Sequence, residues 1–123
     1  MINHYHLIVK FNTLTPLVKA KKLGALLLKL VKVIKMKVLA QPVIRRVSDK
    51  GNEGLSGAVL IKTSHISCHI WDKFNPPLVH MDIYSCKKFS ILKALAFIKK
   101  HMKAFNITYA FLDRDDLSQK YNK

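Results

Sequence analysis

The fold is decided by residues 58–84, which read AVLIKTSHISCHIWDKFNPPLVHMDIY. Short runs rich in β-branched and aromatic residues alternate here with turn-forming residues, as in strands joined by tight connections. Neighbouring strands with such short connections pair antiparallel, so this stretch predicts the centre of an antiparallel sheet. The predicted strands are Ala58–Ile61, Ile66–Trp71 and Val79–Tyr84, with turns near Thr63–Ser64 and Asn75–Pro77.

Two amphipathic helices and three further strands are predicted on either side of this centre. The first helix begins at Pro16, because a missing N–H is tolerated in the first helical turn. The second helix begins near Ser90. Apolar residues recur at helical spacing in both, as Leu23, Leu27, Leu30 and Ile34 in the first and as Ile91, Leu95, Ile98 and Met102 in the second. The outer strands are predicted at Tyr5–Phe11, Met36–Val43 and Ile107–Leu112, with a polar loop over Arg45–Gly54.

The order of these elements is β-α-β-β-β-β-α-β. Two helices can cover only one face of such a sheet. The chain is therefore predicted to form a single α/β domain of the α+β type over residues 1–123. This domain is a two-layer sandwich, in which two helices cover one face of an antiparallel sheet. The strands also carry apolar residues on the second face, which predicts that a homodimer buries it.

The composition restricts where the protein works and what it binds. The chain carries 22 Lys+Arg against 7 Asp+Glu, a net charge of +15 that attracts polyanions. Only three of the basic residues are arginines, which usually recognise base edges, so nucleic-acid binding is predicted to be non-specific and electrostatic at most. Two cysteines make no disulfide framework, and no signal peptide or membrane-spanning stretch is recognisable. These features predict a soluble, cytoplasmic protein.

Hydroxyl, imidazole and thiol groups gather on the predicted central strands, at Ser56, Ser64, His69 and Cys86. Spacing alone leaves two interpretations open, a nucleophile with its base or the polar residues of an ordinary strand. His69 follows Ser64 by five residues, about 16 Å along a straight strand, so a bend or the turn must bring the two together. His65 and His69 share a face but lie about 13 Å apart, so no metal site is predicted.

Three blocks of sequence follow one another around these residues. They are Gly54-Leu55-Ser56-Gly57, then Ser64-His65-Ile66-Ser67-Cys68-His69-Ile70-Trp71, then Asp82-Ile83-Tyr84-Ser85-Cys86. In order and spacing they resemble the prokaryotic S-adenosylmethionine decarboxylases, and the flanking strand and helices extend the similarity over almost the whole chain. Members of that family are pyruvoyl-dependent enzymes that cleave their own precursor.

The resemblance implies that the chain is a zymogen that cleaves itself between Thr63 and Ser64, and that Ser64 becomes a covalent pyruvoyl group. It implies that Ser56 supports the processing intermediate, that His69 removes the α-proton of Ser64, and that Cys86 returns a proton to the product. The pyruvoyl cofactor would hold a small-molecule substrate as a Schiff base and act as an electron sink when CO₂ leaves. The implied reaction is the decarboxylation of S-adenosylmethionine for the biosynthesis of the polyamine spermidine.

Three positions depart from the family pattern. Thr63 precedes the cleaved bond, where these enzymes usually have glutamate. Lys73 stands where a glutamate holds the ribose hydroxyls, so Asp72 is the predicted substrate ligand in a shifted register. No aromatic residue stands at 48–53 to stack on adenine. Two alternatives stay open: the same mechanism on arginine or ornithine, and an unprocessed, non-catalytic relative that binds an anionic partner.

Overall fold

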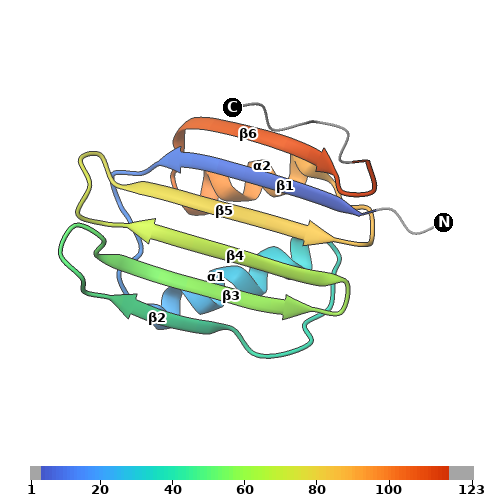
Figure 1. Cartoon of the computed structure of the whole chain (residues 1–123), viewed down its shortest axis with the longest axis horizontal. Helices are drawn as coiled ribbons and strands as arrows, with labels where there is room; N and C mark the ends of the chain where they lie inside the picture. Colours follow the sequence, from blue (N-terminus) through green and yellow to red (C-terminus); the bar gives the residue numbers. More distant parts are fainter. Residues whose placement is uncertain (1–3, 117–123) are drawn as a thin grey trace.

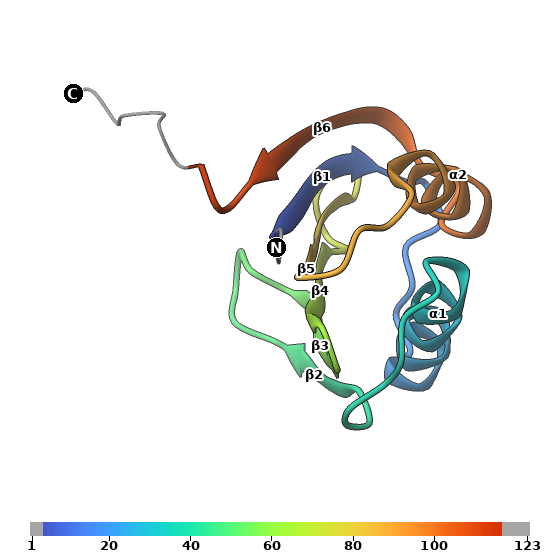
Figure 2. The same ribbon diagram turned by 90° about the vertical axis from the view of Figure 1, so that its right-hand side faces the viewer.

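The computed structural model describes residues 4–116 of the chain. Within them, six strands form one antiparallel sheet in the order β2-β3-β4-β5-β1-β6 (Figure 1). Both helices lie on the same side of this sheet (Figure 2). The predicted two-layer α+β sandwich is confirmed. The elements are β1 Tyr5–Asn12, α1 Ala20–Val33, β2 Val43–Val47, β3 Gly54–Ile61, β4 Ser64–Trp71, β5 Leu78–Ser85, α2 Ile91–His101 and β6 Phe105–Asp113.

The hydrophobic core lies between the sheet and the helices. Leu23, Leu27 and Leu30 of α1 are fully buried there, in one cluster with Ile66 of β4 and Ile98 of α2. Burying each such side chain contributes about 2 kcal/mol relative to leaving it in water. Every second residue of the central strands points into this core, so the residues between them point to the other side of the sheet.

The two glycines of the first sequence block lie in closely packed surroundings. A Cβ at Gly57 would lie 2.4 Å from Cδ1 of Ile44, so a larger residue there would displace the end of this side chain of β2. Gly54 has a φ of +154°, and a Cβ there would lie 1.6 Å from the carbonyl oxygen of Ile70. The glycines thus let β3 lie closely against its neighbours, and Ser56 lies on the face of β3 opposite to that of Gly57.

Two predicted boundaries were wrong. The first helix begins at Ala20, four residues after Pro16. The strand predicted over Met36–Val43 is instead β2, at Val43–Val47, within the predicted polar loop. Pro42 has no N–H to donate, so the ladder starts only after it, while Val38 makes an isolated bridge to Ile61. Arg45 and Arg46 are compatible with β2 because it is an edge strand.

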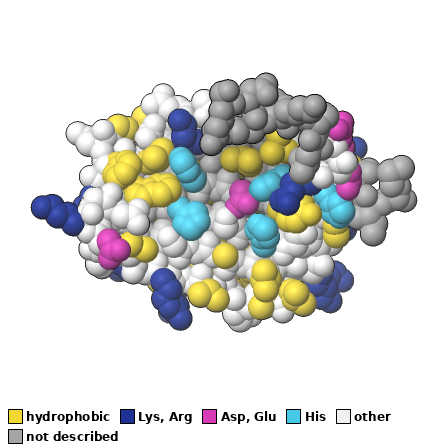
Figure 3. Space-filling view, viewed as in Figure 1, with side chains coloured by type: hydrophobic (Ala, Val, Ile, Leu, Met, Phe, Trp, Pro, Cys, Tyr) yellow, Lys and Arg dark blue, Asp and Glu magenta, His cyan; other side chains and the backbone are white. Residues whose placement is uncertain are grey.

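The face of the sheet away from the helices, called the open face below, has a distinct composition. Figure 3 shows histidines and one acidic group near its middle, with apolar side chains beside them and Lys and Arg mainly around the rim. The large apolar side chains of Ile8 and Leu60 are 41% and 51% exposed there. Within residues 4–116, neither helix is long and apolar enough to cross a membrane.

Candidate active site

The predicted cleavage site lies in the tight turn that joins β3 to β4. Ser64 is the first residue of β4 and pairs with Ile61 on one side and Ser85 on the other. Its φ is +140°, a backbone conformation that residues with a side chain rarely adopt and that costs about 1–3 kcal/mol. The carbonyl oxygen of Thr63 accepts a hydrogen bond from the backbone N–H of Cys86, 2.8 Å away. The structure therefore brings Thr63, Ser64 and Cys86 together at one end of the sheet.

Ser56 and His69 form a second group, on the open face. They are directly opposite each other on β3 and β4, and Oγ of Ser56 lies 2.9 Å from Nδ1 of His69. Both border a cavity of about 260 Å³. The described lining residues of this cavity are Val47, Asn52, Gly54, Ser56, His69, Ile70 and Trp71. The hydroxyl group that lies beside the imidazole of His69 is therefore that of Ser56, and not that of Ser64.

The bend expected between Ser64 and His69 is absent. β4 pairs with β3 and with β5 in unbroken register from Ser64 to Trp71, so hydrogen bonds on both sides hold it extended. His69 therefore stays about 16 Å along the strand from Ser64 of the same chain. The two groups of predicted site residues are separated within one protomer.

Asp72, the predicted substrate ligand, has an ion-pair partner. Its side chain is 4% exposed, and its two oxygens accept hydrogen bonds of 2.5 and 3.1 Å from the guanidinium group of Arg46. A ribose could reach this carboxylate only by displacing Arg46. The role of Asp72 stays a prediction.

Trp71 is a site residue that the sequence analysis overlooked. Its indole N–H donates to Asn52 Oδ1 over 2.7 Å, and its ring meets that of His80 edge-on at 5.0 Å between centroids. It supplies the cavity beside Ser56 and His69 with an aromatic surface, although no aromatic residue precedes Gly54 at 48–53. Strand alternation could have found it, because residues 69 and 71 share a face.

Asp82 was also overlooked, and it is the centre of a polar cluster on the open face. His6 Nε2 lies 2.8 Å from its carboxylate, His65 Nε2 lies 3.5 Å away, and Ser67 donates a hydrogen bond to it. Burial alone would raise the pKa of Asp82, but hydrogen bonds from Ser67 and His6, with the positive charge of His6 and His65, lower it below its ordinary value. Asp82 is thus an anion at neutral pH.

The two cysteines have different surroundings. Cys68 points into the core, where burial raises the pKa of its thiol to about 12 and keeps it protonated. Cys86 is only half-buried and follows β5 directly, beside the Thr63–Ser64 bond. Of the two, Cys86 is the one that could exchange a proton at the cleavage end of the sheet.

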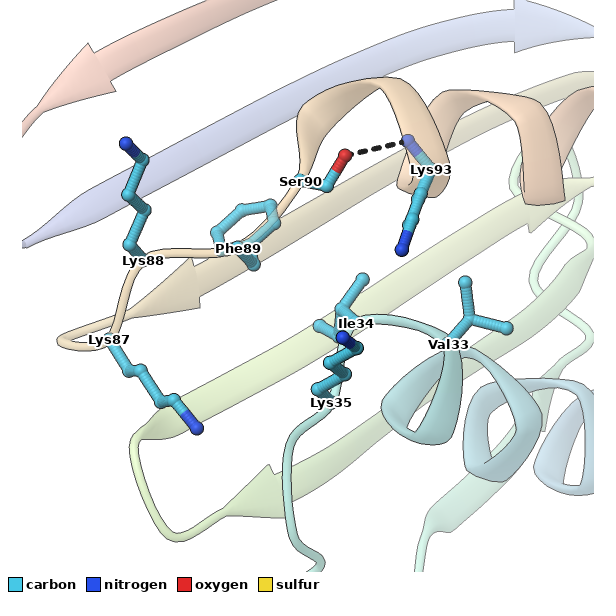
Figure 4. A pocket seen from close by; sticks show the side chains of 8 residues that line it. All are labelled: Val33, Ile34, Lys35, Lys87, Lys88, Phe89, Ser90 and Lys93. Atoms are coloured by element: carbon cyan, nitrogen blue, oxygen red, sulfur yellow. Dashed lines mark hydrogen bonds between the residues drawn. The ribbon is translucent and has the colours of Figure 1, made fainter.

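Another cavity, of about 510 Å³, lies on the helix side, between the end of α1 and the start of α2 (Figure 4). Its eight described lining residues include four lysines and no acidic residue. Figure 4 shows Lys93 extending toward Ile34 and Lys88 extending away from it. Such a concentration of ammonium groups repels a cationic ligand.

Comparisons with known proteins identify the family and support the fold. The sequence model of the S-adenosylmethionine decarboxylase family matches residues 5–115. The S-adenosylmethionine decarboxylase proenzyme of Sulfolobus acidocaldarius is 31% identical over an alignment of 91 residues that covers 63% of this chain and 72% of that protein. The crystal structure of the adenosylmethionine decarboxylase of Aquifex aeolicus has the same fold, with a TM-score of 0.70 and 21% identity over 99% of this chain and 98% of that one. By the extent of the family match, the chain belongs to the S-adenosylmethionine decarboxylases.

Proposed function

We propose that this protein is a pyruvoyl-dependent decarboxylase of S-adenosylmethionine, serving polyamine biosynthesis, and that it makes its prosthetic group from Ser64. The observation that carries the proposal is the geometry of the Thr63–Ser64 turn. Ser64 has a strained backbone, and the Thr63 carbonyl is polarised by a short hydrogen bond from Cys86. Breaking the peptide bond between them releases the constraint on φ, so the strain favours cleavage.

Self-cleavage needs no external oxidant or reductant. Oγ of Ser64 attacks the carbonyl carbon of Thr63, the C–N bond breaks as the C–O bond forms, and the hydroxyl proton ends on the Ser64 nitrogen. A base then removes the α-proton of Ser64, and the Cβ–Oγ bond breaks to release Thr63 as a carboxylate. Water replaces the remaining nitrogen, which leaves as ammonia, and residue 64 keeps a keto group.

The residues present fit the pyruvoyl group. Once formed, it supplies an electron sink for the pair of electrons left behind by CO₂. The half-buried Cys86 is bonded through its backbone to the neighbouring Thr63, and its thiol is the proposed proton donor to the product. The Ser56 hydroxyl orients the imidazole of His69, which is the proposed base of the processing reaction.

Because His69 is held away from Ser64 of its own chain, we assign this base to a second copy. A homodimer with its open faces in contact would supply it, and such contact would also bury Ile8 and Leu60. A two-fold axis between the two faces, perpendicular to β4 and level with Ile66 and Ser67, would place His69 of each copy over the Ser64 end of the other. Lys and Arg side chains lie mainly around the rim of this face, and its middle carries Asp82 with its histidine partners.

The lining of the open face supports S-adenosylmethionine as the substrate. Two cavities of about 260 and 240 Å³ share His69. Trp71 in one offers an aromatic surface for the purine, and Asp82 in the other is an anion suited to a sulfonium cation. Arginine and ornithine could pair their positive charge with Asp82, but they carry no purine to stack on Trp71.

Mass spectrometry under denaturing conditions tests the proposal directly. The purified wild-type chain should give two fragments, residues 1–63 and 64–123, the second blocked to Edman chemistry and reactive toward hydrazines. The Ser64→Ala variant should stay in one piece. Release of labelled CO₂ from carboxyl-labelled S-adenosylmethionine, arginine and ornithine then identifies the substrate. A wild-type chain that stays intact at 14.1 kDa after long incubation at several temperatures contradicts the proposal and favours a non-catalytic relative.

A further inference from the structure

Ser85 is the buried polar residue nearest the proposed cleavage site. It is 0% exposed, and in the sheet it pairs directly with Ser64. We propose that Ser85 is a positioning residue for self-cleavage, acting through the hydroxyl group of Thr63. This inference rests on the proposed function, because it concerns how the Thr63–Ser64 bond is made ready to react.

Hydrogen bonds link the side chains of Ser85, Thr63 and Met36 to the backbone N–H of Lys87. The backbone N–H of Lys87 donates to Oγ of Ser85 over 2.9 Å, so Ser85 accepts there. The single hydroxyl proton of Ser85 is then directed to Oγ1 of Thr63, 3.1 Å away, which is nearer than its second acceptor, the sulfur of Met36 at 3.8 Å. Thr63 in turn directs its own hydroxyl proton to the sulfur of Met36 at 3.3 Å. The result is a directed chain from Lys87 through Ser85 and Thr63 to Met36.

This chain holds the residue that carries the reacting carbonyl at two points. The Thr63 side chain is bonded to Ser85, and the Thr63 carbonyl oxygen is bonded to the N–H of Cys86, the next residue along. With both atoms attached to one short segment, the peptide plane between Thr63 and Ser64 cannot easily rotate. The Cys86 N–H therefore stays directed at the oxygen on which negative charge grows while Ser64 attacks.

A donor fixed in this way stabilises the transition state without reorganising during the reaction. Losing one such donor altogether typically slows a reaction by about 100-fold to 1,000-fold. Removing the Thr63 hydroxyl leaves the Cys86 N–H in place but frees the carbonyl to turn away from it. The expected loss is therefore smaller, about 10-fold in the rate of the acyl shift, as for a modest misplacement of reacting groups.

The hydrogen bonds of Thr63 give its side chain a structural role at the position where the family usually has glutamate. A β-branched side chain with a hydroxyl on Cβ has few rotamers, so it reaches Ser85 and Met36 at little entropic cost. Met36 is buried and lies in the connection between α1 and β2. The chain thus joins three segments that are distant in sequence around the bond to be cleaved.

The test compares variants of the full-length precursor, made by pulsed cell-free synthesis and followed over time. Samples are quenched in denaturant and treated with hydroxylamine, which cleaves the ester and leaves a serine amino terminus, whereas completed cleavage leaves a pyruvoyl terminus. The rates of ester formation and of chain release are thereby measured separately. Thr63→Val should slow ester formation about 10-fold and leave release from the ester unchanged. Thr63→Ser, which keeps the hydroxyl group, should restore the rate.

Two further variants sharpen the result. Ser85→Ala should slow ester formation as Thr63→Val does, and the double variant should be no slower than either single one, because both remove the same link. Thr13→Val makes the same change at another buried threonine, outside this network, and should cleave at the wild-type rate. Should Ser85→Ala fail to fold, the pair Thr63→Val and Thr63→Ser still decides the matter.

The outcomes separate this inference from the proposed function. If the wild-type chain forms neither ester nor fragments, the proposed function itself is wrong. If the wild type cleaves and Thr63→Val forms the ester equally fast, only the positioning role of Ser85 and Thr63 is overturned. A Thr63→Val variant that is slow in chain release but not in ester formation overturns it as well.

Discussion

The cleavage end of the sheet and the middle of its open face are built in opposite ways. Around Thr63 and Ser85 the polar atoms are largely withdrawn from water, and each finds a partner within one chain. Around Ser56 and His69 the side chains face outward beside shallow cavities and apolar neighbours. In the proposed mechanism a single protomer would therefore perform the acyl shift, whereas removal of the α-proton would need a second protomer.

Among the substitutions considered, that of His69 should have the largest effect, because it removes the base proposed to act across the dimer. His69→Ala should still form the ester but release chains about 100-fold to 10,000-fold more slowly, because the general base is lost. Mixing it with Ser64→Ala, which keeps His69, should restore release from the His69→Ala chain. The hydroxylamine assay on the mixed dimer measures both steps.

Light scattering provides the control for that experiment, since mixed dimers require a homodimer. Rescue at micromolar concentration that disappears on dilution would support exchange between copies. A monomeric wild-type protein that cleaves at a rate independent of concentration would show that the two regions act within one chain, and the comparison would fail.

Substitution of Cys86 should affect decarboxylation but not self-cleavage. Because its backbone N–H, not its thiol, contacts the Thr63 carbonyl, Cys86→Ala should still cleave itself. Decarboxylation should fall by about 100-fold or give misprotonated product, since the proton donor is gone. Labelled CO₂ release and mass analysis of the product measure this loss. Cys68→Ala is the matched control, and turnover by Cys86→Ala at the wild-type rate with clean product would remove Cys86 from the mechanism.

Substitution of Asp82 should have the smallest effect, and this effect concerns the free energy of unfolding and its dependence on pH. Its pKa is lowered in the folded state, so the ionised carboxylate stabilises the fold above its unfolded pKa of about 4, and this contribution is lost as pH falls through the lower folded value. Because the group is partly exposed to solvent, the contribution is less than about 1 kcal/mol. Urea unfolding of the wild type and of Asp82→Asn should be measured between pH 2 and pH 7. The difference between their free energies of unfolding should shrink as the pH falls, with a slope that corresponds to at most about one proton. Curves that stay parallel throughout would mean that Asp82 is not stabilised as an anion.

Local patterns in the sequence were enough for most of the fold. Alternating residues and tight turns located the hairpins from Ala58 to Tyr84, and helical spacing located both helices. β2 was misplaced because Val43–Val47 carries two arginines, and whether a strand tolerates them depends on its place at the edge of the sheet. Periodicity describes which residues share a face, but it does not say which strand is at an edge.

The amino-acid sequence by itself was enough to recognise the family and to predict the Thr63–Ser64 bond as the cleavage site, because the residues concerned lie in contiguous blocks. Only the tertiary structure decided how those blocks meet. It showed β4 to be straight, which separates His69 from Ser64, and it brought Met36 to the hydroxyl of Thr63. The physical reason is that hydrogen-bond register and side-chain contacts depend on neighbours distant in the chain, and no local pattern encodes those neighbours.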